Sequence, residues 1–141
     1  MKRRLGVLAL VGLCVVAAGC GSKSYGAKLS AMCEDFAQRE QEIGEPRTPE
    51  ELAQRGDRLV AAYEDTILRP LERVEPPDEF AQEGARLRQL ARQQRDALQA
   101  LADAGKQGNI PQLRRLAVRN AQLNAQAGEI ARQVHADSCT A

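Results

Sequence analysis

The chain has few of the residues on which enzymes and cofactor proteins depend. Its 141 residues include no tryptophan, two phenylalanines, two tyrosines and one histidine. A Ser-His-Asp or Cys-His catalytic set would have to use that histidine, His135, which lies in no nucleophile motif. Zinc and di-iron sites need several closely spaced Cys or His ligands, and the signatures of calcium and phosphate loops are missing. The sequence therefore predicts a protein that is not an enzyme and has no metal site and no cofactor.

The charges nearly balance, with a formal net charge of +1. A chain so close to neutral gives no electrostatic reason to expect nucleic acid as a partner. The two signs are unevenly distributed, because residues 34–83 hold fifteen acids and six arginines, whereas residues 84–134 hold nine basic residues and three acids. We interpret this as oppositely charged helices that attract each other within one fold. The alternative is a basic face that contacts anionic lipid headgroups or an acidic partner.

The first twenty residues have the layout of an export signal. Basic residues at 2–4 precede an uncharged stretch at 5–18, which is shorter than the ~20 apolar residues of a spanning helix. The segment "AAGC" that follows resembles the lipobox of bacterial prolipoproteins, with Ala18 and Gly19 at its two small positions. The resemblance implies that the chain is cut before Cys20 and that the thiol of Cys20 carries a diacylglycerol. The alternative is an ordinary exported chain that is cut nearby and keeps Cys20 as a free thiol or in a disulfide.

The resemblance also implies a domain layout and a location. Residues 1–19 are then a cleaved signal peptide, residues 20–26 a lipidated cysteine with a short flexible tether, and residues 27–141 a single folded domain. Gly21 stands where an aspartate would resemble an inner-membrane retention signal. We therefore expect a lipid-anchored protein on the extracytoplasmic face of the cell membrane or of an outer membrane.

The cysteine count changes once this layout is accepted. Cys14 leaves with the signal peptide and Cys20 carries lipid, so Cys33 and Cys139 remain. An exported chain matures in an oxidising compartment, where a remaining pair favours a disulfide. Two free buried thiols are the alternative.

Apolar residues recur at spacings of three, four and seven, which predicts amphipathic helices. Thr48 in "TPEE" and Asn109 have the pattern of helix N-caps, and Pro70 is expected to kink its helix or end its regular part early. The predicted helices cover residues 27–43, 48–74, 78–105 and 109–136.

Four helices joined by short breaks predict an all-α fold, an antiparallel up-down four-helix bundle. This topology places the start of the first helix and the end of the last at the same end, where Cys33 and Cys139 lie. Small residues on the last helix, among them Gly128 and Ala131, either let helices approach closely or leave a groove for a ligand.

The bundle also brings Met32 near His135, a pair of residue types that can ligate haem. Alternatively Met32 fills the core and His135 interacts with the helix C-terminal dipole. We expect a monomeric, non-enzymatic module of the cell envelope that is attached to the membrane by its lipid and binds an envelope protein or a small apolar ligand. The alternatives are a structural spacer, a haem-binding bundle, and an enzyme with a dispersed carboxylate site.

Overall fold

A computed structural model describes residues 20–45 and 48–140, and within these ranges every regular element is a helix. The predicted all-α class is therefore confirmed for the described chain. The predicted signal peptide, residues 1–19, lies outside these ranges. The elements in chain order are α1 (Cys20–Ile43), α2 (Pro49–Tyr63), the π-helix η1 (Glu64–Leu68), α3 (Arg69–Arg73), the 3-10 helix η2 (Asp78–Phe80), α4 (Ala81–Lys106), α5 (Ile110–Gln133) and the 3-10 helix η3 (Asp137–Cys139).

Both predicted N-caps are confirmed. The Thr48 hydroxyl accepts a hydrogen bond from the backbone N–H of Glu51 at 3.2 Å, at the start of α2. The Asn109 side chain accepts one from the backbone N–H of Gln112 at 3.1 Å, at the start of α5. Each cap satisfies a backbone donor that the helix itself leaves unpaired, so these two helices begin where their sequences indicate.

The regular part of the second predicted helix ends early, as Pro70 indicated, but without a break. Proline has no N–H to donate and its ring crowds the carbonyl four residues before it. The chain widens into the π-helix η1 just before it, and the N–H of Arg69 bonds the carbonyl of Glu64, five residues back. The wider turn lets α3 continue with Pro70 in its first turn.

The start of the first helix was predicted wrongly, because α1 begins at Cys20 and includes the residues expected to form a flexible tether. Distant contacts explain the extra turns. Tyr25 is buried with 3% of its surface exposed, and its ring lies 6.4 Å from that of Phe80. Gly26 is buried against the backbone of Val134 and His135. Packing against the end of the chain therefore keeps this segment helical despite its glycines and serines.

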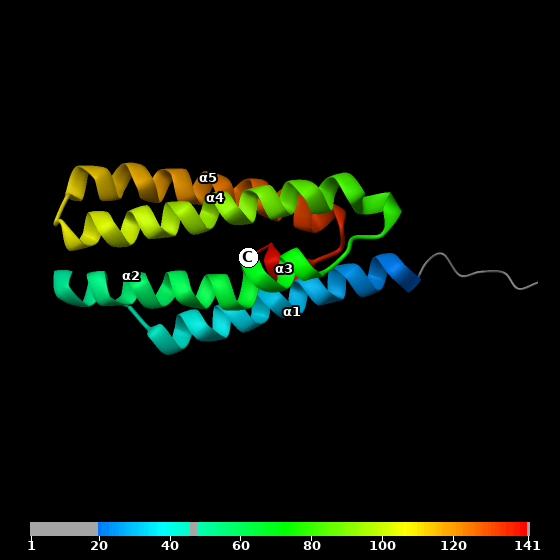
Figure 1. Ribbon diagram of the computed structural model, residues 1–141, viewed down its shortest axis with the longest axis horizontal. Coiled ribbons are helices and arrows are strands. Elements are labelled where there is room, and N and C mark those ends of the chain that lie inside the picture. Colours follow the sequence, from blue (N-terminus) through cyan, green and yellow to red (C-terminus); the bar gives the residue numbers. More distant parts are fainter. Residues whose placement is uncertain (1–19, 46–47, 141) are drawn as a thin grey trace, which may run out of the picture.

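The long helices lie in two pairs along the length of the molecule (Figure 1). Helix α1 packs beside α2, α2 packs against α4, and α4 packs against α5 along its length. The C-terminal turn η3 contacts both α1 and α5. The main apolar core gathers near that turn and is made of Tyr25, Leu29, Leu71, Leu87, Leu90, Ala91, Ala97, Leu123, Ile130, Ala131, Val134 and Ala136.

Candidate functional site

A disulfide joins the C-terminal turn η3 to α1. Cys33 of α1 and Cys139 of η3 are joined by an S–S bond of 2.00 Å, with their Cα atoms 5.3 Å apart. Beside it the Ser138 hydroxyl donates a hydrogen bond of 2.6 Å to the carboxylate of Glu34. The end of the chain is thus attached to the middle of α1 by a covalent bond and a hydrogen bond.

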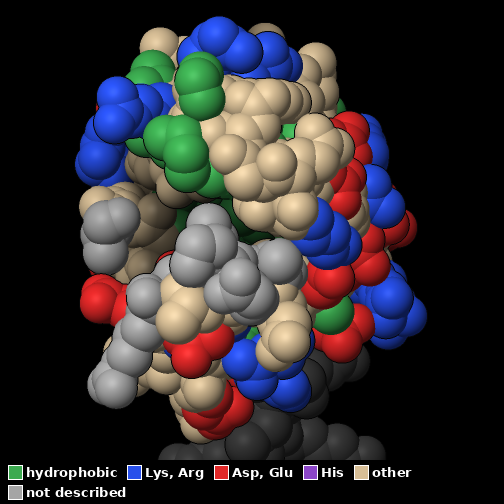
Figure 2. Space-filling model, turned by 90° about the vertical axis from the view of Figure 1, so that its left-hand side faces the viewer, with side chains coloured by type: hydrophobic (Ala, Val, Ile, Leu, Met, Phe, Trp, Pro, Cys, Tyr) green, Lys and Arg blue, Asp and Glu red, His purple; other side chains and the backbone are tan. Residues whose placement is uncertain are grey.

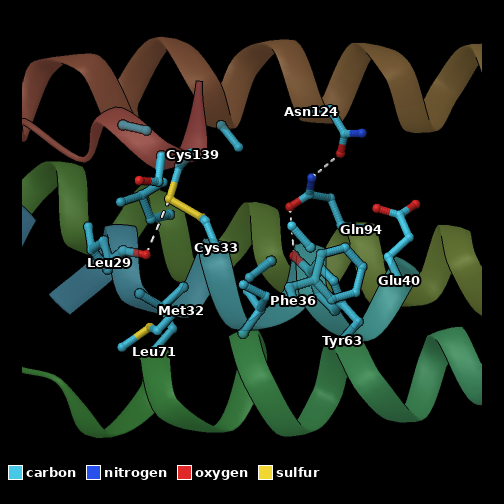
Figure 3. Close-up of a pocket in the computed structure, with 17 residues that line it drawn as sticks. Leu29, Met32, Cys33, Phe36, Glu40, Tyr63, Leu71, Gln94, Asn124 and Cys139 are labelled. Atoms are coloured by element: carbon cyan, nitrogen blue, oxygen red, sulfur yellow. Dashed lines mark hydrogen bonds between the residues drawn. A yellow bond between two sulfur atoms is a disulfide. The ribbon is translucent and has the colours of Figure 1, made fainter. Parts of the chain in front are cut away.

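A groove of about 310 Å³ runs from this disulfide between α1 and α5, with side chains of α2, η1, α3 and α4 also facing it (Figure 3). Most of its lining is apolar, as expected of a small-molecule site. The small side chains of α5 leave this space open, because Ala127 and Ala131 stand where larger residues would fill it. The lining consists of Leu29, Met32, Cys33, Phe36, Ala37, Glu40, Tyr63, Ile67, Leu71, Leu87, Ala91, Gln94, Asn124, Ala127, Ala131, Ser138 and Cys139.

Three polar side chains from three helices are hydrogen-bonded in series within this groove (Figure 3). The Tyr63 hydroxyl donates to Gln94 Oε1 at 2.7 Å, and Gln94 Nε2 donates to Asn124 Oδ1. Burial raises the pKa of Tyr63 well above its ordinary value, so its hydroxyl keeps the proton that it donates. The rings of Phe36 and Tyr63 pack in a T-shaped arrangement, with their centroids 5.3 Å apart. Each hydrogen bond of the series is therefore donated in the direction from Tyr63 toward Asn124.

The hydroxyl of Tyr63 is expected to stabilise the fold, and the hydroxyl of Tyr25 provides the control. Tyr63→Phe is expected to lower the free energy of unfolding by about 1–3 kcal/mol, because the buried acceptor of Gln94 loses its donor. Tyr25→Phe removes a hydroxyl that is buried and has no hydrogen-bond partner among the described residues, so it is expected to cost nothing or to stabilise. Urea unfolding of the two variants measures both changes. Equal losses in the two variants would contradict the assigned role of the Tyr63 hydroxyl.

Met32 and His135 do not share a cavity. Met32 lines the groove, whereas His135 is exposed and lines a separate hollow with Ala27 and Ser30. His135 follows α5 with a positive φ of 60°, and its ring lies 6.4 Å from that of Phe80. The structure therefore does not bring the two proposed haem ligands into one site.

Some of the unevenly distributed charges form ion pairs between neighbouring elements of the fold. Three ion pairs link the basic α4 to acidic residues of preceding elements, at N–O distances of 2.7 to 3.4 Å: Lys106–Asp57, Arg95–Glu64 and Arg92–Glu72. These pairs fit the interpretation of mutually attracting helices.

The first half of α5 is different. Its arginines 114, 115 and 119 form no ion pair with any described residue, and Ile110 and Val118 on the same stretch are 54% and 59% exposed. Figure 2 views this end of the molecule and shows hydrophobic and basic side chains next to each other. A basic, partly apolar surface thus remains on α5 in addition to the ion pairs that link α4 to the preceding elements.

Comparison with family models, curated protein sequences and solved structures finds no match to this chain. Among the described residues, no helix has the length and apolar character needed to cross a membrane. The described side chains also include no group of three or more His, Cys, Asp or Glu residues placed to bind a metal ion. The groove and the sequence of the N-terminus are therefore the two features of this chain that indicate a function.

The sequence indicated the groove only weakly. For the small residues of the last helix, a ligand groove was one of two predicted alternatives, and close helix approach was the other. In the structure Ala131 lines the groove, whereas Gly128 is buried. The sequence patterns singled out none of the three polar residues Tyr63, Gln94 and Asn124 as site residues. The available signal was a glutamine at a position that the helix period places among buried residues such as Ala91 and Leu98.

Proposed function

We propose that the protein is a lipid-anchored, extracytoplasmic binding protein whose groove holds a small apolar molecule. In this proposal the chain is cut before Cys20, acylated there, and folds outside the cytosol as a monomer on the cell membrane or an outer membrane. The basic start, the apolar stretch and "AAGC" support the anchor. The Cys33–Cys139 disulfide supports the location, because such bonds persist in oxidising compartments.

We further propose that the four long helices form an antiparallel up-down bundle. Helices α4 and α5 pack side by side and are joined by the three residues between Lys106 and Ile110. A connection that short favours neighbours that run in opposite directions. The disulfide links α1 to η3, the turn that follows α5, which is compatible with the first and last long helices being neighbours in this topology. The figure supports the same arrangement, with α1 paired to α2 and α4 paired to α5 (Figure 1).

The groove is the observation that carries the binding proposal. Its volume of about 310 Å³ lies at the lower end of the range of roughly 300–1,000 Å³ typical of small-molecule sites. Apolar walls with a few placed polar groups are also typical of such sites. A structural spacer would have no need of an open apolar groove beside its core.

Filling the groove is expected to weaken binding. The test uses residues 20–141 with Cys20→Ser, shown to be helical by circular dichroism, and an apolar dye that fluoresces when it leaves water. Ala127→Phe places a ring among the lining residues and is expected to weaken dye binding about tenfold or more. Ala125→Phe is the matched control, because Ala125 is exposed on the same helix and does not line the groove.

Binding that is equally strong in the two variants would overturn the proposal, because the dye would then be bound elsewhere. Binding that falls equally in both would overturn it as well, since the loss would follow from the added ring rather than from the groove.

A further inference from the structure

The hydrogen-bonded series in the groove has unused donors at one end. Tyr63 gives its proton to Gln94, and Gln94 gives one amide proton to Asn124. This leaves the second amide proton of Gln94 and both amide protons of Asn124 without an acceptor among the described residues. Asn124 is exposed, whereas Gln94 is 9% exposed. The series therefore presents N–H donors where the apolar groove meets solvent.

The charge of the lining and its hydrogen-bond donors together favour a neutral ligand that has an acceptor. Glu40 is the lining residue that carries a charge, since the Tyr63 hydroxyl stays protonated and the two cysteines are joined. Figure 3 shows the Glu40 carboxylate extending toward the same side of the groove as Gln94 and Asn124. A carboxylate or phosphate ligand would lose water here without gaining a cation, and it would face Glu40. A cationic head would be attracted by Glu40, but that carboxylate is exposed and screened by water, and an ammonium group has no lone pair to accept a hydrogen bond from the amide donors.

We propose that the groove selects an uncharged single-chain amphiphile, such as a long-chain alcohol or neutral ester, whose head oxygen accepts hydrogen bonds from Asn124 and Gln94. This inference rests on the proposed function and narrows it to one class of ligand. The apolar chain lies between α1 and α5, against Met32 and Phe36, with the disulfide at the far end. The neutral head lies at the polar end, where its oxygen replaces a water molecule on the amides.

Three probes with the same chain and different heads test the selection. Membranes that carry the intact chain are exposed to photoreactive, alkyne-tagged forms of dodecanol, dodecanoate and dodecylamine. Digestion and mass spectrometry then locate the label, and the ratio of groove peptides to all labelled peptides corrects for partitioning into lipid. We expect this ratio to be about tenfold higher for dodecanol than for either charged probe. The peptide that begins at Cys20 reports in the same digest whether that residue is acylated.

Two variants test whether the amide donors cause the preference for dodecanol. Gln94→Leu keeps a side chain of similar length while removing the amide, and Asn124→Ala changes an exposed residue with little effect on the core. Both are expected to retain dodecanol label in the groove and to lose most of the tenfold preference. Competition by unlabelled dodecanol distinguishes a saturable site from nonspecific label.

Each result has one meaning. Equal labelling of the groove by all three probes overturns the inference and leaves the proposed function standing. A preference for dodecanoate or dodecylamine overturns the inference in the same way, as does a dodecanol preference that survives in both variants. Labelling of groove peptides no stronger than that of other apolar peptides overturns both the inference and the proposed function.

Discussion

Reduction of the Cys33–Cys139 disulfide is expected to lower the free energy of unfolding by about 2–5 kcal/mol, which corresponds to a fall in Tm of roughly 8–20 °C. The two cysteines are 106 residues apart. When the domain unfolds, the bond therefore still restricts the conformations of nearly all of its residues. In the folded state the bond ties α1 to the turn that follows α5. The loss is expected to be large because the groove leaves few other side chains to join α1 to α5.

Thermal unfolding of residues 20–141 with Cys20→Ser, with and without a thiol reductant, measures this effect. The variant that carries Cys33→Ser and Cys139→Ser together is the control. It is expected to unfold at the temperature of the reduced protein and to show no response to reductant. An unchanged Tm on reduction would show that the bond contributes no stability, and would remove the support that it gives to an oxidising location.

Gly26→Ala is expected to destabilise the protein by at least about 2 kcal/mol. A Cβ atom at this position would lie 2.4 Å from the carbonyl oxygen of Val134 and 2.5 Å from that of His135. Both contacts are with backbone, so no side chain can rotate to relieve them, and α1 must move away from the turn that follows α5. We expect the shift to loosen the packing of Tyr25, which belongs to the main core.

Gly128→Ala is the matched control for this prediction. It too replaces a buried helical glycine, but the nearest atom to its added Cβ is the Cys139 carbonyl oxygen, at 3.8 Å. This is an ordinary contact, and alanine favours a helix over glycine by roughly 0.5–1 kcal/mol, so Gly128→Ala is expected to stabilise. Chemical denaturation of both variants gives the two free energies. Changes of the same sign and size would contradict the close approach of α1 at Gly26.

The helices could be predicted where their determinants are local. The spacing of apolar residues located all four long helices, and the side chains of Thr48 and Asn109 fixed two starting points. The start of α1 could not be predicted in this way, because Tyr25 and Gly26 stay helical through contacts with residues some fifty to a hundred positions later. Local glycines and serines indicated a tether, and tertiary packing overrides that preference.

The groove was less predictable than the helices for a related reason. Its polar series joins Tyr63, Gln94 and Asn124, which lie about thirty residues apart in sequence and meet only when three helices are in register. Helix periodicity indicates which face of each helix is apolar but does not fix how far two helices stand apart. The separation of α1 from α5 depends on side-chain volumes summed across the fold.

The π-helix η1 is a segment from which one residue could be deleted without changing the register of the helices on either side. Elsewhere in these helices a single deletion would turn all later side chains by about 100° and move apolar residues out of the core. Within Glu64–Leu68 the wide turn already contains one more residue than an α-helical turn needs. Shortening this segment by one residue would restore ordinary α-helical winding and leave both flanking helices facing as before. Comparison of single deletions along the chain would therefore reveal a local tolerance at this turn, which itself contains the groove residue Ile67.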